Sequence, residues 1–221
     1  MIKGIVFDFD GVILESVAVK DQAIFDLFRN ESQQVRQRVL DLHRDTPGIN
    51  RRSRLELLLT KGLGKEHVTA REVDALLQQF SELIWQGLLN CPEVPGVRKF
   101  LEDLPDIPCY VASAGPGQEV QTLARERNFL QYFEDILGAP RKKPDMLQEI
   151  VAGEQVSAKN ILFIGDKISD YHAAHQAGTA FLGRKTAHNP TAFPDNVPVI
   201  TDFTPGRTYL LHELIYNSQH H

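Results

Sequence analysis

Two aspartates near the start of the chain, Asp8 and Asp10, have a type and spacing that could do chemistry. They follow the run Ile2–Phe7, which is rich in β-branched and aromatic residues and is typical of a strand buried on both faces of a parallel sheet. Gly11 comes next and permits a sharp turn. Two carboxylates spaced i, i+2 point the same way on an extended strand, so we expect a divalent metal to offset their repulsion. By itself, so short a motif is more often a solvated acidic turn.

Polar groups also follow a second predicted strand, at 109–113. That strand ends at Ser113, and Ala114 and Gly115 lead into a predicted helix. A hydroxyl beside free backbone N–H groups at the N-terminus of a helix can bind an anion. Serine is also a common N-cap residue, so this feature gains meaning only together with the others.

Two later predicted strands end in charged residues. The strand at 136–138 leads into the basic triplet Arg141–Lys143, directly before Pro144. The strand at 161–165 ends at Asp166, and Asp170 follows in the first turn of a predicted helix. Ligand sites of open α/β sheets lie at the carboxyl ends of their strands, so we expect these groups to form one site.

The elements that position these residues are predicted to form an α/β fold with a doubly wound parallel sheet. After residue 92, short apolar runs alternate with helical patterns, which is typical of repeated β-then-α units. Two more strands are expected near 179–182 and 197–200, and a last helix at 207–216. Gly178 is expected to end the helix that begins at Ser169.

A long helical insertion separates the first strand from the second. Roughly 75 residues show helical periodicity, whereas a crossover helix needs only about a dozen. Thr69 and Glu72 form a capping box ahead of the longest stripe, which runs from Val73 to Leu88. We therefore predict an α/β core made of residues 1–14 and 92–221, and a helical domain at 15–91.

Composition limits the classes of protein that fit. Hydrophobic residues at 42% and charged residues at 24% are typical of a soluble globular chain. The net charge of −5 argues against a dedicated nucleic-acid binder, and no apolar run is long enough to predict a membrane span. Cys91 and Cys109 are the only cysteines, which favours a reducing, cytoplasmic setting.

Taken together, the motifs resemble those of the haloacid dehalogenase superfamily of phosphohydrolases. That signature is DxDGx after the first strand, Ser or Thr after the second, Lys before Pro, and GDxxxD after the fourth. The corresponding segments are DFDGV at 8–12, Ser113, Lys143-Pro144, and GDKISD at 165–170. The resemblance covers essentially the whole chain, because the helical insertion is similar to the C1-type cap of this family.

The resemblance implies a Mg²⁺ cofactor and a covalent mechanism. Asp8, Asp166 and the backbone carbonyl of Asp10 would hold Mg²⁺, and Asp170 would orient metal-bound water. Asp8 would attack phosphorus to form an aspartyl phosphate. Asp10 would protonate the leaving oxygen and then deprotonate the hydrolytic water.

The same resemblance assigns the phosphate-binding groups. Ser113, the neighbouring backbone at Ala114 and Lys143 would neutralise and position the phosphoryl oxygens. Many relatives read Lys-Pro-x-Pro-Asp, and the triplet here leaves the register ambiguous, so Lys142 is the alternative lysine. The expected partner is a small phosphorylated metabolite, with sugar phosphates as one candidate class, and the expected assembly is a monomer or weak dimer.

Other functions remain open at this stage. Asp10 favours phosphoryl transfer over dehalogenation, because the dehalogenase branch lacks an acid at that position. A sugar phosphomutase is an alternative, although relatives of that kind often have His where Lys20 stands. Lys20 could instead indicate a phosphonatase that forms a Schiff base. A non-catalytic receiver-like module is the alternative of another class, but no large helical insertion is expected in it.

Three arginines, Arg51, Arg52 and Arg54, open a short predicted helix of the insertion. Cations are disfavoured in a first helical turn by the helix macrodipole. At about 100° per residue, Arg51 shares a face with the apolar Leu55, and Arg54 lies at the edge of that face. We predict that Arg51 and Arg54, with Lys20, contribute to substrate specificity; full solvation of the arginines is the alternative.

Overall fold

The computed structural model describes residues 1–46, 49–104, 107–186 and 193–205. The chain divides into two compact units, one formed by Met1–Glu15 with the chain from Pro92 onward, and the other by Ser16–Cys91. The helix predicted at 207–216 lies outside the described residues.

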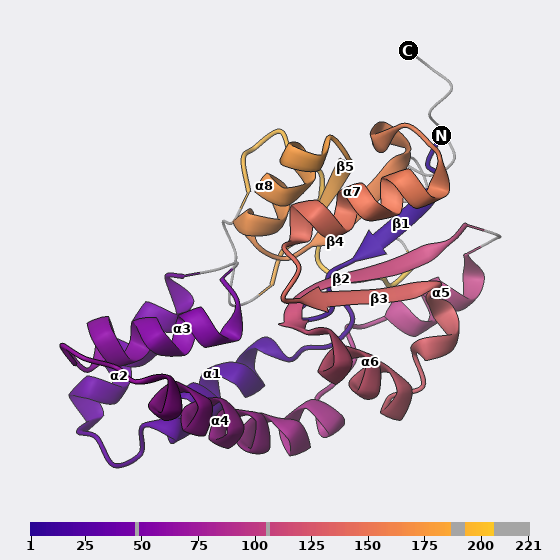
Figure 1. Ribbon diagram of the computed structural model, residues 1–221. Helices are drawn as coiled ribbons and strands as arrows, with labels where there is room; N and C mark the ends of the chain where they lie inside the picture. Colours follow the sequence, from indigo (N-terminus) through magenta and orange to yellow (C-terminus); the bar gives the residue numbers. More distant parts are fainter. Residues whose placement is uncertain (47–48, 105–106, 187–192, 206–221) are drawn as a thin grey trace. The chain divides into compact units, whose positions relative to one another are not determined.

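The first unit contains a six-stranded, fully parallel sheet in the order β3-β2-β1-β4-β5-β6. Helices α7 and α8 cover one face of this sheet, and α5 and α6 cover the other (Figure 1). The predicted doubly wound α/β fold is thereby confirmed. The strands are β1 Gly4–Phe7, β2 Cys109–Pro116, β3 Asp135–Ala139, β4 Ile161–Gly165, β5 Ala180–Arg184 and β6 Val199–Ile200. The helices are α5 Val97–Asp103, α6 Gly117–Glu126, α7 Lys143–Glu154 and α8 Ile168–Ala177, with 3₁₀ turns at Leu130–Tyr132 and Ala158–Asn160.

Alternation along β1 supplies the core on both faces of the sheet. Val6 belongs to the buried cluster that includes Met146 of α7 and Ala173 of α8. The next residue, Phe7, points to the opposite face, where its ring packs edge-on against Phe100 of α5, with centroids 6.4 Å apart. All four residues of β1 are buried, as expected for a central strand of a parallel sheet.

Strand β2 differs from its predicted bounds. It was expected to end at Ser113, but it continues to Pro116. The pairing with β3 shifts register between Ala112 and Pro116, and this irregularity lets the strand extend past Ser113. Helix α6 begins directly after the strand, at Gly117.

The second unit is helical. It contains α1 Val17–Leu27, α2 Gln33–Arg44, α3 Arg51–Leu57, a π-helical turn at Leu58–Gly62 and α4 Ala70–Asn90. The capping box of Thr69 and Glu72 is present at the start of α4. The predicted apolar stripe of α4 is buried at Val73 and at three later positions. Leu83 was also predicted to belong to this stripe, but it is 42% exposed because it lies at the edge of the apolar face.

The two segments that join the insertion to the core run side by side. Leu14 and Glu93 form an antiparallel bridge. The Glu15 N–H donates to the Pro92 carbonyl at 2.9 Å, and the Val94 N–H donates to the Ile13 carbonyl at 3.0 Å. The chain therefore leaves the core and returns to it at one place.

Candidate active site

Two of the predicted aspartates end adjacent strands. Asp8 follows β1 and Asp166 follows β4, and these strands pair directly, with Phe7 opposite Ile164. The Asp8 N–H donates to the Ile164 carbonyl at 2.8 Å, and the Phe9 N–H donates to Asp8 Oδ1 at 2.7 Å. The strand order reverses between β1 and β4, which is where doubly wound sheets place their ligands.

Asp170 reaches the same place from the first turn of α8. The Lys167 N–H donates to Asp170 Oδ2 at 3.0 Å, which fixes the carboxylate against the N-terminus of the helix. Gly165, the last residue of β4, lies so close that a Cβ there would come within 2.4 Å of Asp170 Cβ. Only a glycine lets β4 and α8 approach this closely.

Lys143 joins the aspartates as the first residue of α7. Its Nζ lies 2.8 Å from Asp8 Oδ2 and 2.6 Å from Asp170 Oδ1. Lys142, the N-cap residue of α7, is exposed. Of the two lysines that the sequence left open, the structure brings Lys143 to the carboxylates.

Burial dominates the electrostatics of this cluster. It raises the pKa of Asp8 to about 6 and that of Asp166 to about 7, because the charged carboxylates are removed from water. Lys143 and Lys167 oppose these rises. Burial also works against the charged form of Lys143, but Asp170 and Asp8 outweigh it, so the pKa of Lys143 lies above its ordinary value.

The three aspartates fit a hard divalent cation. Asp8, Asp166 and Asp170 are all buried, and each offers a carboxylate oxygen within 4.8 Å of the other two. An all-oxygen donor set of this kind suits Mg²⁺. Such a cation would also relieve the repulsion among the aspartates, which adds to the effect of burial on the two pKa values.

Ser113 and Ala114 lie in the second half of β2, which is next to β1 in the sheet. Ser113 is fully buried, and its Oγ accepts the Gly115 N–H at 3.1 Å. Since that Oγ accepts one hydrogen bond, its own hydrogen can be donated to another acceptor. Ala114 is half-buried.

Asp10 lies in the turn after β1, where it is half-buried and bridges to Leu14. Arg184, at the end of β5, stabilises this turn. It is buried, and sequence reasoning did not identify it. Its Nη1 donates to the Gly11 carbonyl at 2.7 Å, and its guanidinium also pairs with the Glu15 carboxylate. An arginine at a strand end is usually exposed, so the sequence offered no signal for this role.

Lys167 is a second residue that the sequence did not single out. It is partly buried, and Asp166, Asp8, Asp10 and Asp170 all favour its charged form. Its place between two motif aspartates was the only available signal.

The predicted specificity residues all lie in the helical unit. Lys20 is half-buried on α1. Helix α3 begins at Arg51, as predicted, with Asn50 as its N-cap. Arg51 Nη1 donates to Ser81 Oγ at 2.9 Å, and its guanidinium lies 5.1 Å from the centre of the Phe80 ring.

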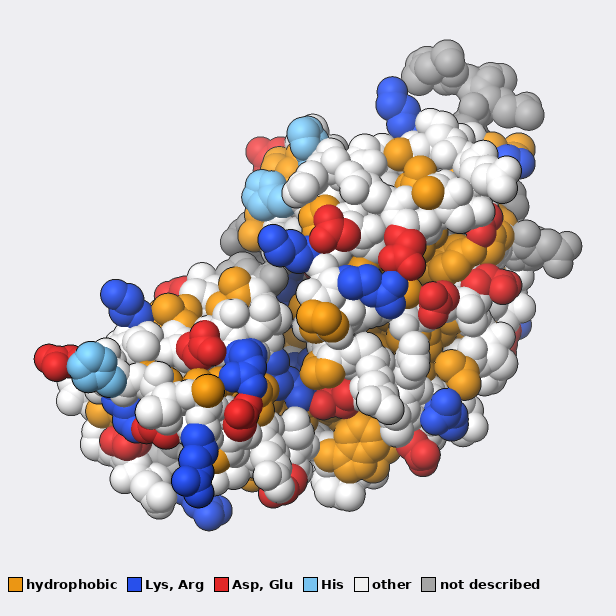
Figure 2. All heavy atoms as spheres, viewed as in Figure 1, with side chains coloured by type: hydrophobic (Ala, Val, Ile, Leu, Met, Phe, Trp, Pro, Cys, Tyr) orange, Lys and Arg blue, Asp and Glu red, His pale blue; other side chains and the backbone are white. Residues whose placement is uncertain are grey.

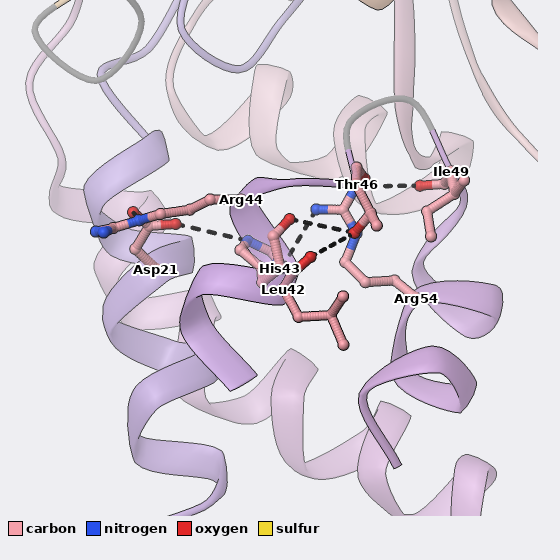
Figure 3. A network of polar contacts seen from close by, with 7 residues as sticks. All are labelled: Asp21, Leu42, His43, Arg44, Thr46, Ile49 and Arg54. Carbon is pink, nitrogen blue, oxygen red and sulfur yellow. Dashed lines mark hydrogen bonds and ion pairs between the residues drawn. The ribbon is translucent and has the colours of Figure 1, made fainter. Parts of the chain in front are cut away.

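Arg54 belongs to a polar network within the same unit (Figure 3). Its guanidinium donates to the Thr46 carbonyl at 2.8 Å and lies 3.3 Å from His43 Nδ1. A guanidinium has no acceptor, so Nδ1 accepts and the hydrogen resides on Nε2, which faces Asp21 at 3.6 Å. These contacts give Arg54 a role in holding the segment before α3; the specificity roles of Lys20, Arg51 and Arg54 stay predictions.

The surface in Figure 2 carries acidic and basic side chains interspersed with uncharged ones. Within the described ranges, no helix combines the length and apolar character needed to cross a membrane.

Comparisons with known proteins agree with this geometry. A family model described as haloacid dehalogenase-like hydrolase matches residues 2–178. A phosphoglycolate phosphatase of Photobacterium profundum is 26% identical over 205 residues, which cover 85% of each chain.

Solved structures show the same fold. A predicted phosphoglycolate phosphatase from Haemophilus somnus aligns with a TM-score of 0.74 at 24% identity, covering 91% of this chain and 95% of that one. A β-phosphoglucomutase from Clostridium difficile aligns with a TM-score of 0.76 at 19% identity over 98% of both chains.

Proposed function

The chain belongs to the haloacid dehalogenase-like hydrolase family, and from this membership we propose that it is a Mg²⁺-dependent phosphohydrolase acting on a phosphate monoester of a small metabolite. The observation that carries the proposal is the buried Asp8 carboxylate, grouped with Asp166 and Asp170 and paired with Lys143. A carboxylate at the carboxyl end of β1 can serve as a nucleophile there.

In the first step, an Asp8 carboxylate oxygen attacks phosphorus in line, and the ester P–O bond breaks. Asp10 donates its proton to the leaving oxygen. Asp8 then carries the phosphoryl group. In the second step, Asp10 takes a proton from water, the water oxygen attacks phosphorus, and inorganic phosphate leaves a regenerated Asp8.

The remaining groups of the cluster bind and orient the phosphate. Lys143, whose ammonium lies between Asp8 and Asp170, supplies positive charge where the phosphoryl oxygens gather. The Ser113 hydroxyl and the backbone at Ala114 supply hydrogen-bond donors. When bound by Asp8, Asp166, Asp170 and the Asp10 carbonyl, Mg²⁺ would neutralise the carboxylates and draw charge from the phosphoryl oxygens.

We infer that the helical unit at Ser16–Cys91 is the cap that selects the substrate. Its size and position after the first motif match a C1-type cap. The named activity of the Photobacterium relative makes phosphoglycolate the first substrate to test, and sugar phosphates the second class.

The test is release of inorganic phosphate from a panel of phosphate monoesters with and without Mg²⁺. The panel includes phosphoglycolate, hexose and pentose phosphates and nucleoside monophosphates. Asp8→Asn should abolish turnover while the far-ultraviolet circular dichroism spectrum stays unchanged, because the amide is isosteric but a poor nucleophile. Asp145→Asn, an exposed aspartate on α7, is the matched control.

Other outcomes would redirect the proposal. Near wild-type activity of Asp8→Asn would rule out the covalent mechanism. Interconversion of sugar phosphates without phosphate release would indicate a mutase. Stable phosphorylation of Asp8 without turnover would indicate a receiver-like module.

A further inference from the structure

Arg184 is a buried cation that the proposed mechanism does not use. It is the last residue of β5. Its guanidinium donates from Nε to the Thr201 carbonyl at 2.8 Å and from Nη1 to the Gly11 carbonyl at 2.7 Å. Both Nη1 and Nη2 also pair with the Glu15 carboxylate, with Nη1 at 3.2 Å from Oε2. Because the guanidinium is planar and rigid, these bonds hold three segments of the core in one arrangement.

The Gly11 carbonyl belongs to the turn that carries Asp10. Gly11 has a φ of 75°, a backbone conformation that glycine adopts readily, and glycine is also the most flexible link in a chain. Its N–H donates to the Leu14 carbonyl at 2.8 Å, and its own carbonyl accepts the hydrogen bond from Arg184. The turn itself therefore holds one side of Gly11, and Arg184 holds the other. Asp10 directly precedes this glycine, so the position of its carboxyl group depends on both bonds.

Burial argues against a direct contact between Arg184 and a substrate. The residue is only 4% exposed, and its Nε and both of its Nη atoms bind other parts of the chain. The ion pair with Glu15 is not a sufficient reason for an arginine here, because apolar side chains often replace a buried ion pair without loss of stability. An apolar side chain could not, however, replace the hydrogen bond to the Gly11 carbonyl.

A second arginine next to the insertion, Arg98 of α5, provides a comparison. It forms an ion pair of the same kind with Glu93, with Nη2 at 2.6 Å from Oε1. It also donates to the carbonyls of Asn128 and Arg127, at 2.8 and 2.9 Å. Arg98 thus holds the segment that returns from the insertion, whereas Arg184 holds the segment that leads into it, together with the turn after β1.

We propose that Arg184 is a positioning residue for Asp10 in the proton transfer to the leaving oxygen. The inference rests on the proposed function. When the ester P–O bond breaks, the Asp10 carboxyl group gives its proton to the departing oxygen, and this transfer requires the two oxygens to lie within hydrogen-bonding distance. By fixing the Gly11 carbonyl, Arg184 holds Asp10 where it can reach that oxygen.

The test compares wild type with Arg184→Met on benzyl phosphate and 4-nitrophenyl phosphate. Both esters carry one aromatic ring, but the benzyl oxygen needs a proton to depart, whereas the nitrophenyl oxygen departs readily without one. The ratio kcat/KM covers the steps up to this departure, so the later reaction of Asp10 with water does not enter. We expect Arg184→Met to lower kcat/KM about 10²-fold for benzyl phosphate, the typical loss for a misplaced catalytic group, and to leave it nearly unchanged for 4-nitrophenyl phosphate.

Three further variants serve as controls. Asp10→Asn should show the same selective loss, and adding Arg184→Met to it should cost little more, because residues that act as a unit give non-additive losses. Glu15→Gln keeps the bond from Arg184 to Gly11 and should keep the wild-type preference between the two esters. Arg98→Met removes the arginine of the returning segment and should also keep that preference.

The folding of Arg184→Met is checked by circular dichroism. If the unpaired Glu15 carboxylate unfolds this variant, the double variant Arg184→Met/Glu15→Gln is measured in its place, because it removes that charge as well.

Equal losses for the two esters, or a further loss of the same size in the Asp10→Asn background, would overturn the role of Arg184. Release of no phosphate from any ester by wild type would instead reject the proposed hydrolysis. Amide hydrogen exchange of residues 9–14, followed by mass spectrometry, separates the two failures. Faster exchange there in Arg184→Met would uphold its hold on the turn even without hydrolysis, and unchanged exchange would reject it.

Discussion

Lys143 connects carboxylates that arise from distant parts of the sequence. Asp8 follows the first strand, whereas Asp170 lies in α8, and one ammonium group contacts both. Removing that ammonium would leave two buried carboxylates without their shared cation, which is costly in a poorly solvated site. The lysine therefore stabilises the cluster, in addition to the phosphate binding that we propose for it.

Lys143→Ala should lower kcat/KM by about 10²–10³-fold, the typical loss when one preorganised charge-stabilising group is removed. Lys142 is the exposed N-cap residue of α7, and Lys142→Ala should leave kcat/KM nearly unchanged. Steady-state kinetics with the best substrate of the panel checks both. Equal, mild losses in the two variants would show that Lys143 is not the phosphate-binding lysine.

Gly165→Ala tests the close approach of β4 to α8. The new Cβ would lie 2.4 Å from Asp170 Cβ and 2.8 Å from Asp170 Cγ, so the carboxylate must move. Displacing a group that supports a metal site typically costs about 10–100-fold in metal affinity or activity, and Mn²⁺ binding measures the loss.

Gly153→Ala is the matched control for this substitution. Gly153 lies in α7, and nothing lies within 4 Å of the added Cβ. Alanine there should stabilise the helix by roughly 0.5–1 kcal/mol and leave Mn²⁺ binding unchanged. Unchanged Mn²⁺ binding in Gly165→Ala would show that Asp170 is not needed for the cation.

Residue types and spacing predicted which aspartates meet, because parallel strands bring their carboxyl ends to one edge of the sheet. They could not choose between Lys142 and Lys143, since that choice depends on where α7 begins. Lys167 and Arg184 escaped prediction for a related reason. Long basic side chains are mostly exposed, and only the tertiary fold shows which of them turn inward.

At the scale of elements, α4 begins at a capping box that the sequence predicted. Thr69 Oγ1 accepts the Glu72 N–H at 3.3 Å, and Glu72 accepts the Thr69 N–H at 2.8 Å. Lys65 adds an ion pair to Glu72 at 2.8 Å. These local contacts explain why the start of α4 was predictable, whereas the length of β2 depends on its irregular pairing with β3.

Glu72 should make the stability of the helical unit depend on pH. The hydrogen bond from Lys65, followed by those from Thr69, lowers the pKa of Glu72 to about 2 from 4.5. An acid with a depressed pKa in the folded state contributes stability above its unfolded pKa and loses it as the pH falls through the folded value. As the pH falls from 4.5 to 2, the free energy of unfolding of wild type should therefore decrease more than that of Glu72→Gln, which has no carboxylate to protonate at this position.

Thermal melts of both proteins across this pH range check the expectation. Glu82→Gln, an acid on the same helix outside the cap, is the control and should follow wild type. Parallel pH profiles of wild type and Glu72→Gln would show that the capping contacts contribute no stability.

At the scale of the whole molecule, the cluster of Asp8, Asp166, Asp170 and Lys143 belongs to one unit and the predicted specificity residues to the other. The cluster draws on β1, β4, α7 and α8, all of which lie outside Ser16–Cys91. The core unit also has its own buried cluster of apolar residues. It therefore meets the conditions for folding without the insertion.

A chain in which a four-residue Gly-Ser linker replaces Ser16–Cys91 should fold and bind Mn²⁺. The expected loss is in turnover of the physiological substrate. Circular dichroism, thermal melting and Mn²⁺ titration measure these properties. A matched deletion of α6, which packs directly on β2 and β3, should prevent folding, and a collapsed or aggregated core chain would show that the insertion is required.

The antiparallel bridge between Leu14 and Glu93 has an evolutionary consequence. Because the two connecting segments are hydrogen-bonded neighbours, the core holds the two points of attachment close together. Any inserted unit whose own ends lie close together can be joined to the core there. If the helical unit selects the substrate, as we propose, exchange of one such unit for another would change the substrate without disturbing the sheet that positions the carboxylates. Under the proposed function, recombination at this junction would supply new substrates while the carboxylate cluster of the core is inherited unchanged.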